Sequence, residues 1–237
     1  IANSQQISQL IGSGNANSSS LPNGYYDGYS ASQQEVVIGS FLTAYTNSAI
    51  DSKTINPRSN LPLPNWTINY NGLSKFAFAK DVVKSFKLNH GYSSSVSVNG
   101  MQTNLNAVTD ANGQATALDI NNNYIAGMQV QNITISERFS PLIGMLATWN
   151  ILGKNITTNF EYKKDRQTTL SLNNNQVTEV LGKEIVVGTV INVPKLKLPI
   201  RTLKASDLLI NVNFSFRDNS TVIRKVVENT NQATAGQ

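Results

Sequence analysis

Few residues in this 237-residue chain could carry out catalysis. It contains a single histidine, His90, and no cysteine, so it offers neither a cysteine nucleophile nor a thiolate metal site. His90 alternates with Leu88 and Tyr92, which favours a histidine that is packed or faces a lumen. No spacing of serines and carboxylates suggests a catalytic triad. We therefore expect no catalytic, cofactor-binding or metal-binding residue, and no enzymatic activity.

Two further segments concentrate polar side chains. The run from Glu161 to Arg166 carries both signs of charge, which we interpret as a solvated strand end. The segment "NGQATALDINNN", residues 112–123, holds one aspartate among several amides. It lacks the regular acidic spacing of an EF-hand loop, so the pattern does not support a calcium site.

The composition is unusual in its low charge. Charged residues make up 14% of the chain, against roughly 25% in a typical soluble domain. Neutral polar residues, mostly Asn, Ser, Thr and Gln, replace them and suit a face turned toward a wet lumen. The net charge is +5, but the basic residues are dispersed and no basic run with interleaved aromatics indicates nucleic-acid binding. No apolar stretch is long enough for a transmembrane helix.

The first part of the chain is rich in Ser, Asn and Gly, and residues 1–31 are expected to form a loop. Ser32 and Glu35 have the spacing of a capping box. The apolar run that follows predicts a short buried helix from Gln33 to Thr46. Gly39 within it costs about 1 kcal/mol relative to Ala, so surrounding structure must stabilise this helix. Pro57, Pro62 and Pro64 then predict an extended connector.

From Trp66 onward the pattern is that of strands separated by turns. Expected strands include Met128 to Ile135, Leu142 to Trp149, Ile156 to Tyr162, Gln167 to Leu172, Gln176 to Val180 and Ile185 to Ile191. Turns are expected at Asn121 to Asn123, Asn150 to Lys154, Asn173 to Asn175, Leu181 to Lys183 and Asp218-Asn219. One segment departs from this pattern: Ala79, Val82, Val83 and Phe86 have helical spacing beside Lys80, Lys84 and Lys87, which predicts a short amphipathic helix.

The segment from Leu208 to Phe216 has the clearest alternation. One face carries Asn211, Asn213 and Ser215, and the other carries Leu208, Ile210, Val212, Phe214 and Phe216. Several of the expected strands are long enough to cross a bilayer when tilted, and aromatic residues lie near their ends. We expect the Leu208–Phe216 row to face lipid and the Asn211–Ser215 row to face a lumen. Periodicity alone leaves a soluble β-sandwich open.

Long blocks of the sequence resemble the SprA/Sov family, the outer-membrane translocon of the type IX secretion system. The blocks include "SQQEVVIGSFLTAYTNS" (32–48), "LPLPNWTINYNGLSK" (61–75), "KSFKLNHGYSSSVSV" (84–98), and the segments 139–180 and 207–237. They follow one another in the family's order over roughly residues 28–237. The resemblance is to the C-terminal portion of that very large protein.

The resemblance implies an all-β fold in which antiparallel strands form part of a very large transmembrane β-barrel. Residues 1–64 would be a loop and a short helix folded inward, and residues 65–237 would be barrel strands. The implied function is export of folded proteins through the outer membrane. The implied partners are outer-membrane lipid, cargo proteins with a C-terminal targeting domain, a PorV-type barrel and a periplasmic plug protein.

Two departures from the family pattern matter. The family has Ile-Pro-Ala-Phe where this chain has Ile38-Gly39-Ser40-Phe41, which implies a less rigid helix. The chain ends in the polar "NQATAGQ" rather than on an aromatic-ended strand, so we expect it to be a fragment of a larger barrel. Two alternatives stay open: another outer-membrane barrel, such as a passive or nutrient-uptake transporter, and a soluble β-sandwich adhesin.

Overall fold

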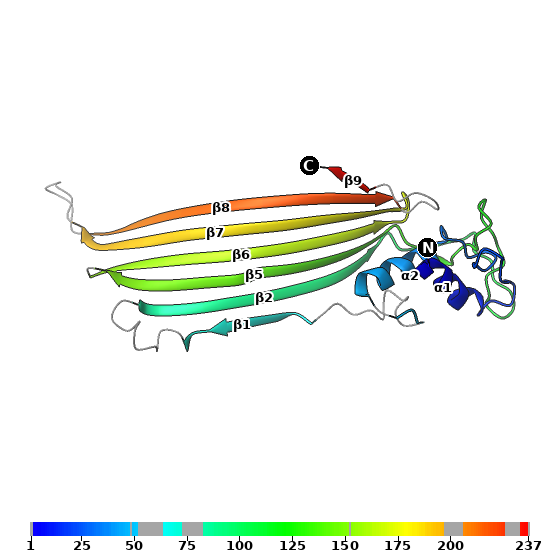
Figure 1. The fold of residues 1–237 in the computed structure, drawn as a ribbon, viewed down its shortest axis with the longest axis horizontal. Helices are drawn as coiled ribbons and strands as arrows, with labels where there is room; N and C mark the ends of the chain where they lie inside the picture. Colours follow the sequence, from blue (N-terminus) through cyan, green and yellow to red (C-terminus); the bar gives the residue numbers. More distant parts are fainter. Residues whose placement is uncertain are drawn as a thin grey trace.

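A long antiparallel sheet dominates the structure, a computed structural model that describes residues 2–47, 49–51, 64–72, 83–151, 153–196, 206–225 and 233–236 (Figure 1). Its strand order is β1-β2-β5-β6-β7-β8-β9. The strands are β1 (Trp66–Tyr70), β2 (Val83–Asn99), β5 (Asn132–Ile151), β6 (Lys154–Ser171), β7 (Gln176–Leu196), β8 (Ser206–Lys225) and β9 (Ala233–Gly236). A second sheet pairs β3 (Gln102–Thr103) with β4 (Met128–Gln129), and the helices are α1 (Ala2–Gly12) and α2 (Gln34–Thr46).

The all-β class is confirmed, and within the described residues the main sheet is open rather than closed into a barrel. Its strands are longer than the pattern predicts. Strands β5 and β8 have 20 residues each and β7 has 21, or ~65 Å at a rise of about 3.3 Å per residue. Segments predicted as separate strands therefore join: Ile156 to Tyr162 and Gln167 to Leu172 are both parts of β6.

Two predicted turns are wrong for the same reason. Leu181 to Lys183 lies inside β7, and Asp218-Asn219 lies inside β8, where these two residues pair with Lys183 and Gly182. Gly182 serves close packing rather than a turn, because a Cβ there would come within 2.6 Å of the Asp165 carboxylate. Instead, β5 and β6 are joined between Ile151 and Lys154, which pair with each other, and a turn at residues 172–175 joins β6 to β7.

The predicted amphipathic helix is also wrong where the structure describes it. Val83, Lys84, Phe86 and Lys87 belong to β2, because the chain pairs with β5 from Val83 onward. Ala79, Lys80 and Val82 lie outside the described residues. Helical spacing of four apolar residues is a weak signal, and cross-strand pairing overrides it here.

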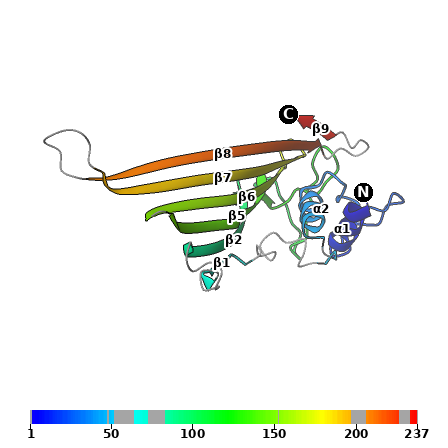
Figure 2. The same ribbon diagram turned by 60° about the vertical axis from the view of Figure 1, so that its left-hand side comes forward.

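A lobe at one end of the sheet contains α1, α2 and the loop of residues 100–131 (Figures 1 and 2). The loop predicted for residues 1–31 is wrong in its first part, because Ala2–Gly12 is helical. Ile7 anchors α1 in a cluster with Tyr29, Val36 and Tyr124. Neither helix has the length and apolar character needed to cross a membrane, as far as the described chain goes.

The predicted buried helix is confirmed as α2, with a different cap. The Gln33 side chain accepts hydrogen bonds from the backbone N–H groups of Glu35 and Val36, so Gln33 rather than Ser32 is the N-cap. Val37, Ile38, Phe41 and Leu42 pack against Val130, which lies between β4 and β5, and against the sheet residues Ile133, Ile135 and Leu170. This packing supplies the support that a short helix containing Gly39 requires.

Candidate functional site

The register of the strands gives the sheet two different faces. Directly opposed residues of antiparallel strands project to the same side of a sheet. Tyr162 of β6 opposes Ile143 of β5 and Ile185 of β7, and Ile185 opposes Phe216 of β8. The register continues at every second residue away from the lobe. A belt of side chains therefore crosses β2, β5, β6, β7 and β8 on one face.

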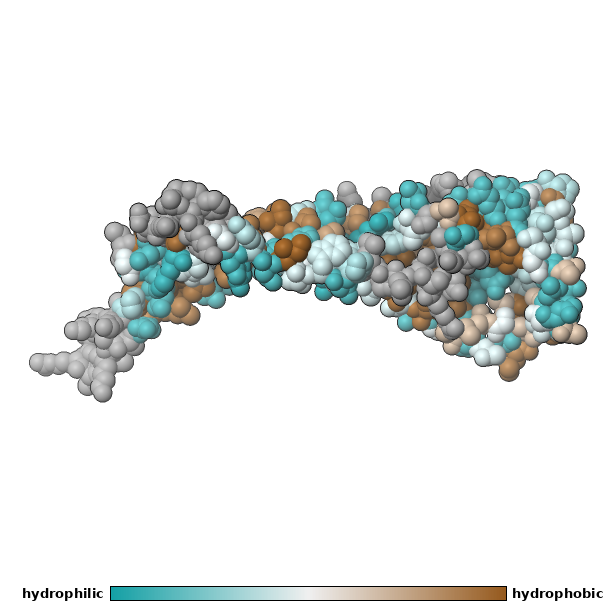
Figure 3. Space-filling model, turned by 90° about the horizontal axis from the view of Figure 1, so that it is seen from below, coloured by the Kyte–Doolittle hydropathy of each residue, from teal (hydrophilic) through white to brown (hydrophobic). Residues whose placement is uncertain are grey.

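We call this set the apolar belt and the side that carries it the belt face. The apolar belt comprises Phe86 and Leu88 of β2, Ile143, Met145, Ala147 and Trp149 of β5, Ile156, Thr158, Phe160 and Tyr162 of β6, Ile185, Val187, Thr189, Ile191 and Val193 of β7, and Leu208, Ile210, Val212, Phe214 and Phe216 of β8. Much of it is exposed: the exposed fraction is 71% for Phe214 and Phe216 and 43% for Val212. Figure 3 views the sheet from the side of β1 and shows hydrophobic residues interspersed with hydrophilic ones along it.

The opposite side, the polar face, carries amides, hydroxyls and charges at the same level. Lys163 Nζ lies 3.0 Å from Glu161 Oε2 and 3.9 Å from Glu184 Oε2. The Ser215 hydroxyl donates to Glu184 Oε1 at 2.9 Å. Asn159 of β6 and Asn213 of β8 flank Gly188. Leu146, Val186 and Val190 interrupt this face without forming a continuous apolar surface.

Charged and aromatic residues bound the belt on the lobe side. Lys164, Lys183 and Asp218 occupy the next row of the belt face, in register with Phe139. Aromatic rings continue toward β1, where the ring centroids of Trp66 and Tyr92 lie 4.4 Å apart and those of Tyr92 and Phe139 lie 4.9 Å apart. At the other border, Trp149 is the last aromatic residue of the belt on β5. The run from Glu161 to Arg166 thus lies in the middle of β6, not at a strand end as predicted.

Helix α2 packs on the belt face. Leu170 lies eight residues after Tyr162 on β6, and the pairing with β7 is continuous between them, so both side chains project to the same side. Leu170 and Ile133 are fully buried in the cluster beneath α2. The expectation that the helix folds inward therefore conflicts with the expectation that the Leu208–Phe216 row faces lipid. Both cannot hold, because the helix and the row share one face.

An ionic network connects α2 to the sheet between the cluster and the belt. Arg166 Nε lies 2.7 Å from Glu179 Oε1, and Arg166 Nη1 lies 3.9 Å from Glu137 Oε2. Arg224 Nη1 reaches the other Glu179 oxygen at 3.1 Å. The Arg166 guanidinium also lies over the Tyr45 ring, 5.5 Å from its centroid. Each of these charged groups has a partner within the network. The network therefore stabilises the position of α2 on the sheet and is not a site with unpaired charge.

The structure gives His90 and Asp119 local structural roles. His90 Nδ1 is 2.7 Å from the Leu142 carbonyl oxygen, and its ring lies between Trp66 and Phe139. His90 is thus a packed histidine. Asp119 Oδ1 accepts hydrogen bonds from the backbone N–H groups of Asn121 and Asn123, which stabilises the loop. Among the described residues, no three His, Asp or Glu side chains gather as metal ligands would.

Asp110 repeats this arrangement in the same loop. Its carboxylate accepts the backbone N–H groups of Gln114 and Asn112 and the Asn17 amide. These hydrogen bonds, led by the one from Gln114, lower the pKa of Asp110 below its usual value. These hydrogen bonds are sufficient to explain the position of the Asp110 carboxylate, and no bound cation is needed.

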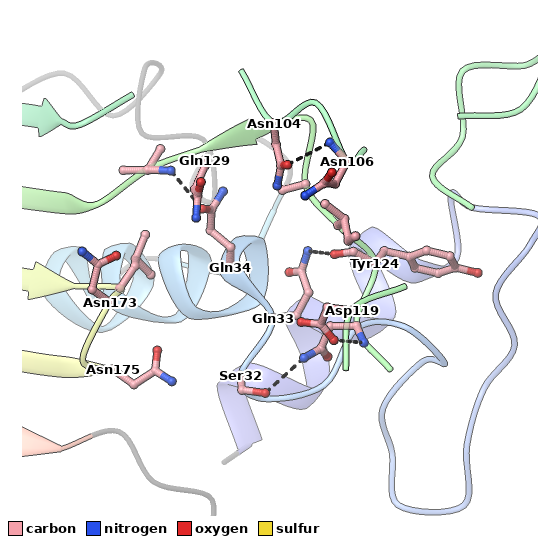
Figure 4. A pocket seen from close by; sticks show the side chains of 15 residues that line it. Ser32, Gln33, Gln34, Asn104, Asn106, Asp119, Tyr124, Gln129, Asn173 and Asn175 are labelled. Atoms are coloured by element: carbon pink, nitrogen blue, oxygen red, sulfur yellow. Dashed lines mark hydrogen bonds between the residues drawn. The ribbon is translucent and has the colours of Figure 1, made fainter. Parts of the chain in front are cut away.

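A polar pocket of about 390 Å³ lies where the N-terminal end of α2, the 100–131 loop and the β6–β7 turn meet (Figure 4). Many of its lining side chains already hold the lobe together. Gln34 donates to the Met128 carbonyl at 2.7 Å and accepts from the Val130 N–H at 3.0 Å. The Asn123 amide donates to the Ser32 hydroxyl at 3.2 Å. The pocket is a structural junction with hydrogen-bonding walls, and Asp119 is its one carboxylate among the described lining residues.

No protein-family model matches this sequence, and no curated protein matches it significantly. The evidence for function is therefore the geometry of the sheet. The sequence pattern predicted the strands that carry the β6, β7 and β8 parts of the belt. It did not predict that these rows align into one belt that extends to β5, or that α2 shares their face, because both depend on pairing register rather than on any one segment.

Proposed function

We propose that this chain forms part of the wall of an outer-membrane β-barrel, with the apolar belt facing lipid and the polar face lining the lumen. The observation that carries the proposal is the belt itself. From Leu208 to the charged row at Asp218 there are ten residue steps along β8, or ~33 Å at about 3.3 Å per residue. With strands tilted by about 40°, this corresponds to a height of ~25 Å, the height of the apolar band in such barrels.

The charges of the polar face determine which side faces lipid. Glu161 lies between Phe160 and Tyr162 in the sequence, so its carboxylate is at belt level on the other side of the sheet. Lys163 and Glu184 are one row farther toward the lobe. A hydrocarbon environment would penalise these groups by several kcal/mol. A water-filled lumen accommodates them, so the belt face is the lipid face.

This choice places α2 on the outer surface of the wall, beyond the membrane, rather than inside the barrel. The helix covers the rows of Ile133 and Leu170, which are separated from the belt by the network around Arg166. The apolar surface beneath the helix is thus buried by protein, whereas the belt is left for lipid.

The open edges of the sheet require further strands. Strand β9 pairs only with Thr221 to Arg224 of β8, so among the described residues no strand pairs with the β8 edge from Leu208 to Ser220. Unpaired backbone groups in hydrocarbon cost several kcal/mol each, which is why membrane-spanning sheets close. Additional strands of a larger barrel would satisfy both this edge and the edge at β1.

The cargo follows from the resemblance to the SprA/Sov family in residues 28–237. On that basis we propose that the barrel exports folded proteins carrying a C-terminal targeting domain, assisted by a PorV-type barrel and a periplasmic plug. We assign the chain no catalytic role, so His90→Ala is expected to leave secretion unchanged. A β-sandwich is disfavoured because the belt's β8 residues are so exposed. A barrel for small solutes shares the same wall and is distinguished by experiment.

The test is a secretion assay in the source bacterium. Cells depleted of the full-length protein are expected to retain a folded fluorescent reporter bearing the targeting domain in the periplasm. Uptake of small dyes and nutrients should stay unchanged in the same cells. Normal export of the reporter together with impaired solute uptake would instead support the transporter alternative.

A further inference from the structure

Two lysines meet at the lobe-side border of the apolar belt. Lys164 of β6 and Lys183 of β7 are direct cross-strand partners, and both are exposed on the belt face. They occupy the row next to Tyr162 and Ile185, so their aliphatic stems adjoin the belt. Like charges placed directly opposite each other destabilise a sheet unless something neutralises them. The two ammonium groups therefore require a nearby anion that neutralises their charge.

Nearby protein groups do not supply that anion in full. Lys163, Arg166, Arg217 and Arg224 each have a carboxylate oxygen within 4.0 Å. Within the described part of the chain, no such contact forms with Lys164 or Lys183. Asp218 continues their row on β8, opposite Lys183, and offers a single carboxylate for two ammonium groups. A net positive charge thus remains on an exposed surface that directly adjoins the apolar belt.

We propose that Lys164 and Lys183 bind the phosphate of a membrane lipid in the leaflet nearer the lobe. This inference rests on the proposed function, because it requires the belt to lie in the bilayer. Long lysine side chains can keep their stems against apolar surface while the ammonium groups reach the headgroup level. Phe139 in the same row, and Tyr92 and Trp66 beyond it, belong to the aromatic level at which headgroups lie.

The lobe side is the outer side in this arrangement. Short turns of such barrels face the periplasm and longer loops face outward. Strands β5 and β6 meet at the pair Ile151 and Lys154 at the end away from the lobe, so their connection is short, whereas the long 100–131 connection lies at the lobe end. The lipid would thus be a phosphorylated lipid of the outer leaflet.

The experiment uses the full-length protein in phosphatidylcholine vesicles with increasing fractions of phosphatidylglycerol, a lipid with one phosphate and net negative charge. A bimane fluorophore at Phe139→Cys reports on lipids beside the lysine pair, and brominated acyl chains on either lipid quench it. We expect a severalfold preference for phosphatidylglycerol at this site. K164Q/K183Q should abolish the preference, since each basic residue contributes roughly fivefold at an anionic surface. K163Q, on the polar face, is the matched control and should retain it.

A second fluorophore at Phe214→Cys separates this inference from the proposed function. It should be quenched by brominated chains of both lipids in every variant, because it lies within the belt. Quenching at Phe214 without any lipid preference at Phe139 would overturn the lysine site alone. Loss of quenching at Phe214 would overturn the membrane assignment itself. Abolition of the preference by ~10 mM inorganic phosphate would show that the pair binds free phosphate, which would also contradict a lipid site.

Discussion

The Trp149 indole Nε1 donates a hydrogen bond to Thr158 Oγ1 at 2.8 Å. The two residues lie diagonally on β5 and β6, within the apolar belt and at its border away from the lobe. Each has a polar group that the proposed lipid environment would otherwise leave unpaired. Because the donor and the acceptor satisfy each other, the belt accommodates two polar side chains at small cost.

Removing the Thr158 hydroxyl should therefore be costly. Thr158→Val leaves the indole N–H without its acceptor, and we expect the local opening free energy of the β5–β6 hairpin to fall by about 1–3 kcal/mol. Hydrogen exchange followed by mass spectrometry measures this as faster exchange over both strands. Thr189→Val, at the position opposite Thr158 on β7, is the matched control and should change exchange little. Equal effects of the two substitutions would argue against the bond.

A charge introduced at the level of the belt should destabilise the proposed barrel more on the belt face than on the polar face. Val212→Arg places a guanidinium on the belt face and should cost about 2–4 kcal/mol near the bilayer midplane. Asn213→Arg, one residue later and on the polar face, should cost much less. Guanidinium-induced unfolding of the full-length protein in vesicles compares the two. A larger cost at Asn213 would reverse the assignment of the faces.

Helix α2 should depend on its contact with the sheet. Phe41 is 9% exposed in the cluster that contains Ile133 and Leu170. Phe41→Asp removes this packing, for which truncation of a buried Phe typically costs about 3–5 kcal/mol, and also buries a charge. We expect hydrogen-exchange protection of residues 34–46 to be lost and barrel assembly to be impaired. Ala44→Asp adds the same charge at an exposed position of the helix and should have little effect.

Membrane orientation follows from the ends of the hairpins. Asp218-Asn219, predicted as a turn, lies within β8 and therefore marks neither side of the membrane. In the proposed barrel, the long 100–131 connection would put the lobe outside. A membrane-impermeant maleimide should label Asn174→Cys, in the β6–β7 turn, in intact cells. Lys154→Cys should react only after the outer membrane is opened, and the opposite result would invert the orientation.

The alternation in β8 was predictable because it is local: every second residue from Leu208 to Phe216 is apolar. The turn at Asn173 to Asn175 and helix α2 were predictable for the same reason. The prediction of a turn at Asp218-Asn219 was wrong because polar residues inside a long strand have the same composition as a turn. The β7 pairing, not the residue types, keeps this segment extended.

The position of α2 could not be predicted from local pattern. It depends on Ile133 and Leu170 being cross-strand partners and on an uninterrupted register from Leu170 to Tyr162. Similarly, the lysine pair appears only when β6 and β7 are aligned, because Lys164 and Lys183 are far apart in sequence. Pairing between distant segments is set by the whole sheet, and a single-segment pattern does not contain it.

The assignment of the faces is tested most directly by spin labels at two adjacent residues. The chain has no cysteine of its own, so Val212→Cys and Asn213→Cys provide single labelling sites in this part of the full-length protein. In reconstituted vesicles, the label at Val212 should be accessible to oxygen and shielded from a water-soluble nickel chelate, because it faces hydrocarbon. The label at Asn213 should show the opposite preference. Access of the nickel chelate to Val212, or shielding of Val212 from both reagents, would contradict a lipid-facing belt.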